Sequence, residues 1–114
     1  QGVEIVTEAL SLDAAVRHAD LVITGEGRID SQTIHGKVPI GVARVAKRYD
    51  IPVIGIAGSL TKDVGVVYDH GLDAIFSVIP RICTLDEALE NAADNLRMNA
   101  RNIAAVMKLA RAKP

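Results

Sequence analysis

The fold is decided by one stretch of the chain, Leu21-Val-Ile-Thr-Gly-Glu-Gly-Arg-Ile-Asp-Ser-Gln-Thr-Ile-His-Gly-Lys37. It opens with a continuous apolar run and ends just before Pro39, where a helical pattern begins. Such a run is typical of a parallel strand that is covered on both faces. Glycines, acids and a lysine after such a strand lie where α/β proteins usually bind their ligands. We therefore expect any active site to be built around Gly25 to Lys37.

The rest of the chain alternates between predicted strands and helices. Further strands are expected over residues 3–6, 53–57 and 74–79, with a glycine-bearing turn over residues 58–61. Helices are expected from Ser11 and from Pro39, with a short one near residues 64–68. Thr84 and Glu87 form a capping box that opens the longest predicted helix. This alternation predicts an α/β fold with a mostly parallel sheet.

Length and composition exclude several classes of protein. The 114 residues fit one domain, 49% of them are apolar, and the net charge is −1. This balance argues against a disordered chain and against nucleic-acid binding. Neither a signal peptide nor a membrane-spanning run is evident, so we expect a cytoplasmic protein with no membrane partner. The single cysteine, Cys83, suits a reducing compartment and is best interpreted as a small, half-buried hydrophobe.

The chain also has the features of a piece of a longer protein. It begins at Gln1 without a methionine and enters a predicted strand almost at once. Four predicted strands make a small sheet for a doubly wound α/β domain, which usually has five or six. We therefore expect at least one strand of the sheet to come from elsewhere.

The glycine-acid-lysine stretch predicts an anion site and a metal site. Gly25 and Gly27 are expected to allow positive φ angles and close approach of a ligand to the backbone. Lys37 places a cation where the next helix begins, which suits an anion. Glu26 and Asp30 are candidates for Mg²⁺ ligands, and Asp30 for the acceptor of a hydroxyl proton. Thr33 and Ser31 offer further oxygen atoms.

The common phosphate motifs do not match this stretch. A P-loop requires glycine five residues before its Gly-Lys pair, where this chain has Ser31. The dinucleotide fingerprint requires a third glycine where this chain has Asp30. A plain tight turn with solvated charges therefore remains an alternative to a functional loop.

The same residues resemble a known family. The segments Thr24 to Thr33, Gly36 to Ala43 and Pro52 to Gly58 strongly resemble the carboxyl-terminal part of bacterial glycerate kinases of the type associated with glyoxylate, galactarate and glucarate utilisation. The resemblance implies transfer of the γ-phosphoryl of ATP to D-glycerate with 2-phosphoglycerate as product. It also implies a flavodoxin-like or Rossmann-like three-layer domain in a two-domain enzyme, of which residues 1–114 are an incomplete, carboxyl-terminal part.

The resemblance also places residues in the expected cleft. Roles in catalysis are assigned as hypotheses to Asp30, Lys37 and Glu26, with Glu26 and Asp30 as the candidate Mg²⁺ ligands. Substrate or phosphate binding is assigned to the remaining matched positions, Gly25, Gly27, Arg28, Thr33 and Gly36. ATP and Mg²⁺ are the implied cofactors, and the rest of the kinase chain is the implied partner. The alternative function is a freestanding nucleotide- or anion-binding module without catalysis. A homodimer is a separate expectation for the assembly.

Overall fold

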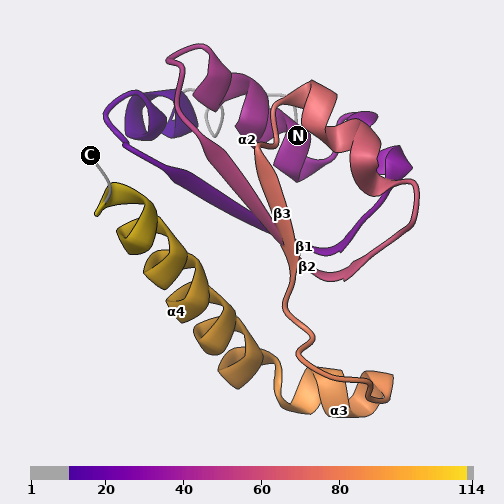
Figure 1. The fold of residues 1–114 in the computed structure, drawn as a ribbon. Helices are drawn as coiled ribbons and strands as arrows, with labels where there is room; N and C mark the ends of the chain where they lie inside the picture. Colours follow the sequence, from indigo (N-terminus) through magenta and orange to yellow (C-terminus); the bar gives the residue numbers. More distant parts are fainter. Residues whose placement is uncertain (1–10, 113–114) are drawn as a thin grey trace. The chain divides into compact units, whose positions relative to one another are not determined.

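A computed structural model describes residues 11–112 of the chain, which fall into two compact units. The first unit ends at Phe76 and the second begins at Ser77 (Figure 1). The sequence predicted one domain for the whole chain. The strand predicted over residues 3–6 lies outside the described residues.

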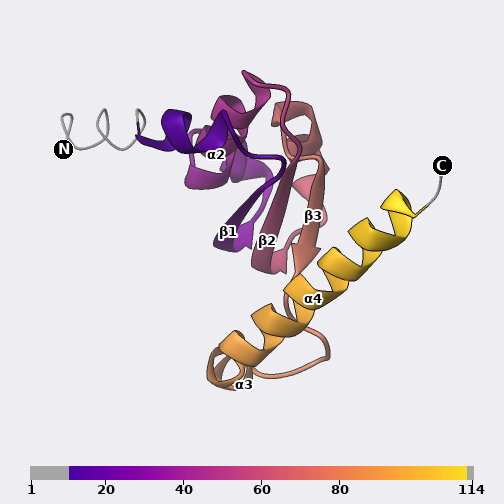
Figure 2. The ribbon, with the colours of Figure 1, turned by 90° about the vertical axis from the view of Figure 1, so that its left-hand side faces the viewer.

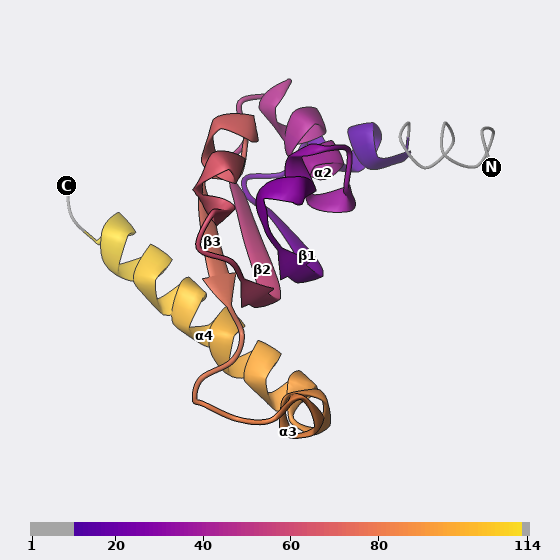
Figure 3. The same cartoon turned by 90° about the vertical axis from the view of Figure 1, so that its right-hand side faces the viewer.

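Three strands form the sheet, in the order β1-β2-β3. β1 (Val22–Ile29) pairs in parallel with β2 (Val53–Leu60), with Val22 opposite Val53. β3 (Ala74–Ser77) is short, and Figure 3 shows that all three arrows run in the same direction. The predicted α/β class with a parallel sheet is therefore confirmed.

Both long strands extend further than the sequence predicted. Residues 25–29 and 58–60 were expected as loops, but they continue the β1–β2 ladder, in which Glu26 lies opposite Ala57 and Arg28 opposite Ser59. The expected positive φ angles at Gly25 and Gly27 are wrong, because only Gly36 and Gly71 have them among the described glycines. Both glycines lie within β1, whose extended backbone pairs with β2. On the partner strand, a Cβ built on Gly58 would lie 2.7 Å from the Gly27 carbonyl oxygen. Gly58 therefore permits close strand approach rather than a turn.

The core of the first unit lies between the sheet and the helices packed on it. α2 (Val38–Lys47) begins with Pro in its first turn, as predicted, and buries Ile40, Ala43 and Ala46. These side chains join those of Ile29 and Val53, which are fully buried, and residues of the helical segment 11–16. Figure 2 shows the backbone of α2 beside the sheet. Hydrophobic burial of this kind is the main term that holds such a sheet against its helices.

Two 3-10 helices follow the long strands. η1 (Ser31–Ile34) comes directly after β1, and η2 (Val64–His70) follows β2 in place of the predicted short helix. Gly71 ends η2 with φ +102°, a conformation that favours glycine. The two long strands thus each end in a short helical turn at the same edge of the sheet.

The second unit contains α3 (Leu85–Glu90) and α4 (Ala92–Arg111). The predicted capping box is confirmed, because the Glu87 N–H donates to the Thr84 hydroxyl at 3.2 Å and the Thr84 N–H donates to the Glu87 carboxylate at 3.3 Å. The single long helix is wrong, because Asn91 interrupts it at φ −100° and ψ 12°. The Asn91 side chain and N–H both donate to the Glu87 carbonyl, and this local bonding competes with a continuous helix.

Candidate functional site

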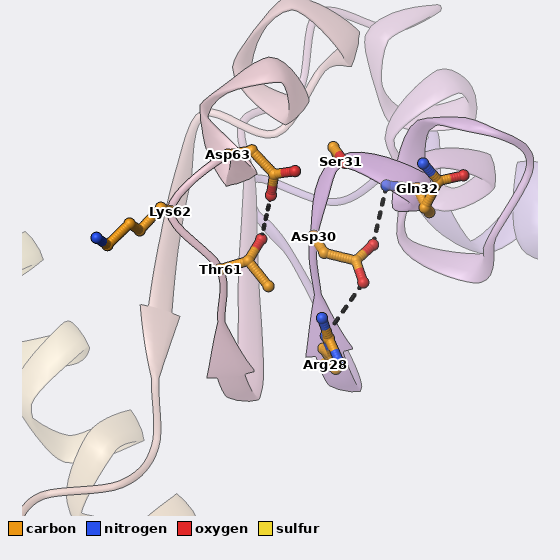
Figure 4. Close-up of a pocket in the computed structure, with 7 residues that line it drawn as sticks. All are labelled: Arg28, Asp30, Ser31, Gln32, Thr61, Lys62 and Asp63. Atoms are coloured by element: carbon orange, nitrogen blue, oxygen red, sulfur yellow. Dashed lines mark hydrogen bonds and ion pairs between the residues drawn. The ribbon is translucent and has the colours of Figure 1, made fainter.

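A pocket of about 510 Å³ lies where β1 and β2 end (Figure 4). All the residues that line it are polar or charged, and they come from two short segments: Arg28, Asp30, Ser31 and Gln32 after or at the end of β1, and Thr61, Lys62 and Asp63 after β2. The carboxyl ends of adjacent parallel strands are the usual place for a ligand in an α/β sheet. Two cations and two carboxylates therefore meet at a position that the topology itself favours.

Asp30 is held in a fixed orientation at the start of η1. Its Oδ1 accepts from the Gln32 N–H at 2.9 Å, and its own N–H donates to the Thr33 hydroxyl at 3.0 Å. These two hydrogen bonds form a reciprocal capping box. Asp30 is thus oriented by the local sequence before any ligand binds.

The second oxygen of Asp30 faces a guanidinium group. Arg28 Nε lies 3.1 Å from Asp30 Oδ2, and the Arg28 side chain is 64% exposed while that of Asp30 is 14% exposed. One guanidinium group carries five N–H donors, so this contact leaves others available to a phosphate or carboxylate. The pair therefore combines a guanidinium group that can bind an anion with a carboxylate that is largely shielded from solvent.

The second segment of the pocket, Thr61 to Asp63, was not predicted as part of a site. The Thr61 hydroxyl donates to the Asp63 carboxylate. The hydrogen bond from the Thr61 hydroxyl is the main cause that lowers the pKa of the Asp63 carboxyl. Lys62 lies between them, exposed and on the pocket lining.

The sequence did contain a signal for this segment. The sequence predicted Thr61 as part of a glycine-bearing turn at the end of a strand, and Asp63 as an acid in the first turn of the helix that follows. Asp63 instead precedes η2 and makes no side-chain cap bond to it. Because consecutive parallel strands end at the same edge of a sheet, the loop after β2 must lie beside the loop after β1. Lys62 and Gln32 belong to no recognisable motif, so only the adjacency of the two loops identifies them as pocket residues.

Several predicted site residues lie away from the pocket lining. Thr33 is fully buried, and its hydroxyl accepts from the Asp30 N–H. Gly36 has φ +90°, and Lys37 occupies the N-cap position of α2 with an extended backbone and an exposed side chain. The structure therefore uses Thr33 and Gly36 to shape the turn between Asp30 and Lys37.

The remaining predicted residues lie within β1. β2 pairs with Gly25 and Glu26 and lies beside Gly27. The Glu26 carboxylate accepts from the Gly27 N–H at 3.3 Å. Within residues 11–112, no group of three or more His, Cys, Asp or Glu side chains has the arrangement of a metal site. Of the residues assigned to the cleft, the structure brings Arg28 and Asp30 together.

A parallel α/β sheet with a charged pocket at its carboxyl edge belongs to the class of α/β proteins in which this edge is the usual place for a small ligand. The model of the "Glycerate kinase family" matches residues 1–108, and the chain belongs to this family.

Individual relatives agree with the family match. The chain is 65% identical over 108 residues to a glycerate 2-kinase of Escherichia coli K12, covering 95% of this chain and 28% of that protein. It is 58% identical over 111 residues to a glycerate kinase of Bacillus subtilis 168, covering 97% of this chain and 29% of that protein. The chain thus spans less than a third of the length of these relatives.

A solved structure shows the same arrangement. The crystal structure of a protein designated glycerate kinase 2 from Salmonella typhimurium LT2 matches with a TM-score of 0.70 at 60% identity. The match covers 100% of this chain and 28% of that one. Both the family and the fold are therefore shown, for a segment of a longer type of protein.

Proposed function

We propose that this chain forms part of an ATP-dependent kinase that transfers the γ-phosphoryl group of ATP to D-glycerate and yields 2-phosphoglycerate. The proposal rests on the family match over residues 1–108, which includes every residue of the pocket. The printed name of the Escherichia coli relative, a glycerate 2-kinase, supports the position of transfer. Because the chain spans less than a third of its relatives, we expect it to have little activity by itself.

The chemistry of phosphoryl transfer suits the composition of the pocket. The substrate hydroxyl oxygen forms a bond to the γ-phosphorus, the bond from phosphorus to the bridging oxygen breaks, and ADP leaves with that electron pair. Catalysis of this step depends mainly on positioning and on charge neutralisation. Arg28 and Lys62, with Lys37 nearby in the chain, are the cations of this segment that can contact phosphate or the glycerate carboxylate.

Asp30 is the best candidate for the group that accepts the hydroxyl proton. Its carboxylate is shielded, lies on the pocket lining and is oriented by the capping box. An oriented carboxylate within reach of the hydroxyl can accept its proton as the new bond to phosphorus forms. Glu26, which lies within β1, is proposed to support the reacting groups or to bind the metal, not to accept the proton.

The residues present fit a Mg²⁺ ion that arrives with the nucleotide. Magnesium prefers hard oxygen ligands and is commonly held by one or two carboxylates together with substrate phosphates and water. Asp30 and Asp63 line the pocket and supply such oxygens, with Ser31 and Thr61 beside them. When bound, the ion would neutralise charge on the phosphates, and Asp30, with Glu26 as the other sequence candidate, would help to hold it.

The proposal is tested with the full-length kinase that contains this segment. Asp30→Asn preserves the cap, because asparagine caps as well as aspartate, but it removes the charge. We expect Asp30→Asn and Lys37→Ala each to lower kcat/KM for glycerate by about a hundredfold or more, which corresponds to about 2.7 kcal/mol. ADP release gives the rate, and circular dichroism verifies that each variant is folded.

Matched controls separate these effects from a general loss of charge. Asp69→Asn on η2 and Arg44→Ala on α2 remove exposed charges outside the pocket lining and should leave turnover unchanged. Near-normal turnover in the Asp30 or Lys37 variant would remove that residue from the site. A wild-type protein that binds Mg-ATP without phosphorylating glycerate would instead support the non-catalytic module. Cytoplasmic location, a role in glyoxylate metabolism and a homodimer remain predictions.

A further inference from the structure

Thr33 is a polar side chain that the structure buries instead of presenting it to a ligand. It lies in η1, it is fully buried, and it is not among the residues that line the pocket. A hydroxyl with no exposed surface is not available to a substrate, and its burial is costly unless it is hydrogen-bonded. Any contribution of Thr33 to the reaction must therefore come from the groups that it bonds inside the protein.

Three hydrogen bonds connect Thr33 to Asp30 and Lys37. The Thr33 hydroxyl accepts from the Asp30 N–H at 3.0 Å, and the Thr33 N–H donates to the Asp30 carbonyl at 3.1 Å. The Thr33 carbonyl accepts from the Lys37 N–H at 3.4 Å. Asp30, before η1, and Lys37, after it, both have proposed roles in the reaction. Thr33 is thus bonded to the backbone of both.

The direction of the Asp30 carboxylate depends on the same turn. Its Oδ1 accepts from the Gln32 N–H at 2.9 Å and its Oδ2 lies 3.1 Å from Arg28 Nε, as Figure 4 shows. The Gln32 N–H belongs to the turn that the two bonds between Thr33 and Asp30 close. Without the Thr33 hydroxyl, the part-buried Asp30 N–H would lose its acceptor, and an unpaired group of this kind favours a rearranged backbone.

We propose that Thr33 is a positioning residue of the phosphoryl-transfer site, which fixes Asp30 and Lys37 relative to each other. This inference rests on the proposed kinase function. Thr33 acts through the backbone of these two residues and does not touch the reacting atoms. Their placement matters because a displacement of about 1 Å can cost about a hundredfold in rate.

Two substitutions in the full-length protein separate the Thr33 hydroxyl from the rest of the side chain. Thr33→Val removes the hydroxyl oxygen at nearly constant volume. We expect it to lower kcat per folded molecule about ten- to a hundredfold and to change KM for glycerate less than about threefold, since Thr33 does not bind substrate. Thr33→Ser keeps the hydroxyl and should retain kcat within about threefold of the wild type. Circular dichroism gives the folded fraction of each variant.

Thr24→Val is the matched control, because it makes the same change at another buried threonine. Thr24 lies in β1, outside the pocket lining, and its substitution should leave kcat and KM unchanged. A Thr33→Val variant with kcat close to that of the wild type would overturn the inference. Equal losses from Thr33→Ser and Thr33→Val would also overturn it, because the methyl group would then be the important part. A loss confined to KM would instead indicate a contact with substrate.

A double variant tests whether Thr33 acts through Asp30. Asp30→Asn removes the charge of the proposed proton acceptor but keeps the cap. Adding Thr33→Val to Asp30→Asn should cost far less than Thr33→Val costs in the wild type, since residues of one network are not additive. An equal loss in both backgrounds would contradict an action through Asp30.

Amide hydrogen exchange tests the bond between Thr33 and Asp30 without relying on activity. In the full-length protein, the Asp30 N–H should exchange about tenfold faster or more in Thr33→Val than in the wild type, Thr33→Ser or Thr24→Val. Unchanged exchange would overturn the inference, because Thr33 would not hold Asp30. A wild-type protein that fails to phosphorylate glycerate would overturn the proposed function and the contribution of Thr33 to it, while the exchange result would still report on the bond itself.

Discussion

The two edges of the sheet use aspartate in opposite ways. At the amino edge, Asp73 precedes β3, and its Oδ2 accepts from the Val53 N–H at 2.7 Å and from Lys47 Nζ at 2.5 Å. Lys47 also donates to the Ile51 carbonyl at 3.2 Å. At the carboxyl edge, Asp30 and Asp63 are also hydrogen-bonded, but they border an open pocket.

The comparison shows that the surroundings of an aspartate, not its residue type, separate structure from function. Asp73 fastens the start of β2 to the start of β3 and to the end of α2, and it is not among the pocket residues. The carboxylates of the other edge are oriented by their own loops and face space that a ligand can enter. One edge therefore stabilises the sheet, and the other is available for chemistry.

The largest effect on stability is expected from a side chain added at Gly58, where β1 and β2 approach each other closely near the pocket. A Cβ at Gly58 would lie 2.7 Å from the Gly27 carbonyl oxygen, which is backbone and cannot move aside as a side chain can. We expect Gly58→Ala to lower the free energy of unfolding by about 2 kcal/mol. Urea denaturation measures this loss. The rate of the proposed kinase reaction should also fall, because the two pocket walls follow these strands.

Gly27→Ala is the matched control for this change. A Cβ on Gly27 would meet no atom within 4 Å, so we expect a change in stability of about 0.5 kcal/mol or less. Equal losses from the two substitutions would mean that glycine is needed at both positions for backbone freedom instead of for close approach at one.

A smaller effect is expected at the amino edge. Asp73→Ala removes the acceptor of the Val53 N–H, and Val53 is fully buried. We expect a loss of about 1–2 kcal/mol in the free energy of unfolding, mainly from this unpaired N–H. The Lys47 contact adds little, because both side chains of that pair are partly exposed.

Asp73→Ala should leave the kinetics of the carboxyl edge unchanged. In the full-length protein, kcat/KM for the proposed kinase reaction should equal that of the wild type per folded molecule, because Asp73 is not part of the pocket lining. A large kinetic loss at unchanged stability would contradict the division between a structural edge and a functional edge.

The smallest effect is a dependence of stability on pH at the amino edge. Burial raises the pKa of Asp73, but hydrogen bonds from Lys47 and Val53 and the charge of Lys47 outweigh it, so the pKa is lowered. The folded state thus favours the carboxylate, and its contribution is present above the unfolded pKa of about 3.9 and lost as pH falls through the folded pKa. The stability gap between the wild type and Asp73→Asn should therefore shrink below about pH 4, as urea denaturation would measure. A gap that stays constant into acid would contradict the ionic account.

Much of the fold could be predicted because its signals are local. The apolar runs before Thr24 and before Gly58 predicted the first halves of β1 and β2, and the Thr84–Glu87 capping box predicted the start of α3. The strand ends could not be predicted, because glycine is permissive and its conformation depends on the partner strand. The break at Asn91 was missed because helical periodicity continues across it.

The sequence alone predicts which residues form helices and which acids follow the strands, since periodicity and capping act between neighbours along the chain. The sequence was sufficient to predict the family and a parallel sheet. It also predicted one wall of the pocket, with Arg28 and Asp30 at the end of β1. Only the tertiary structure decided that Thr61, Lys62 and Asp63 form the other wall. These residues line the same pocket as Ser31 because β1 and β2 pair side by side, and that pairing is a property of the folded sheet.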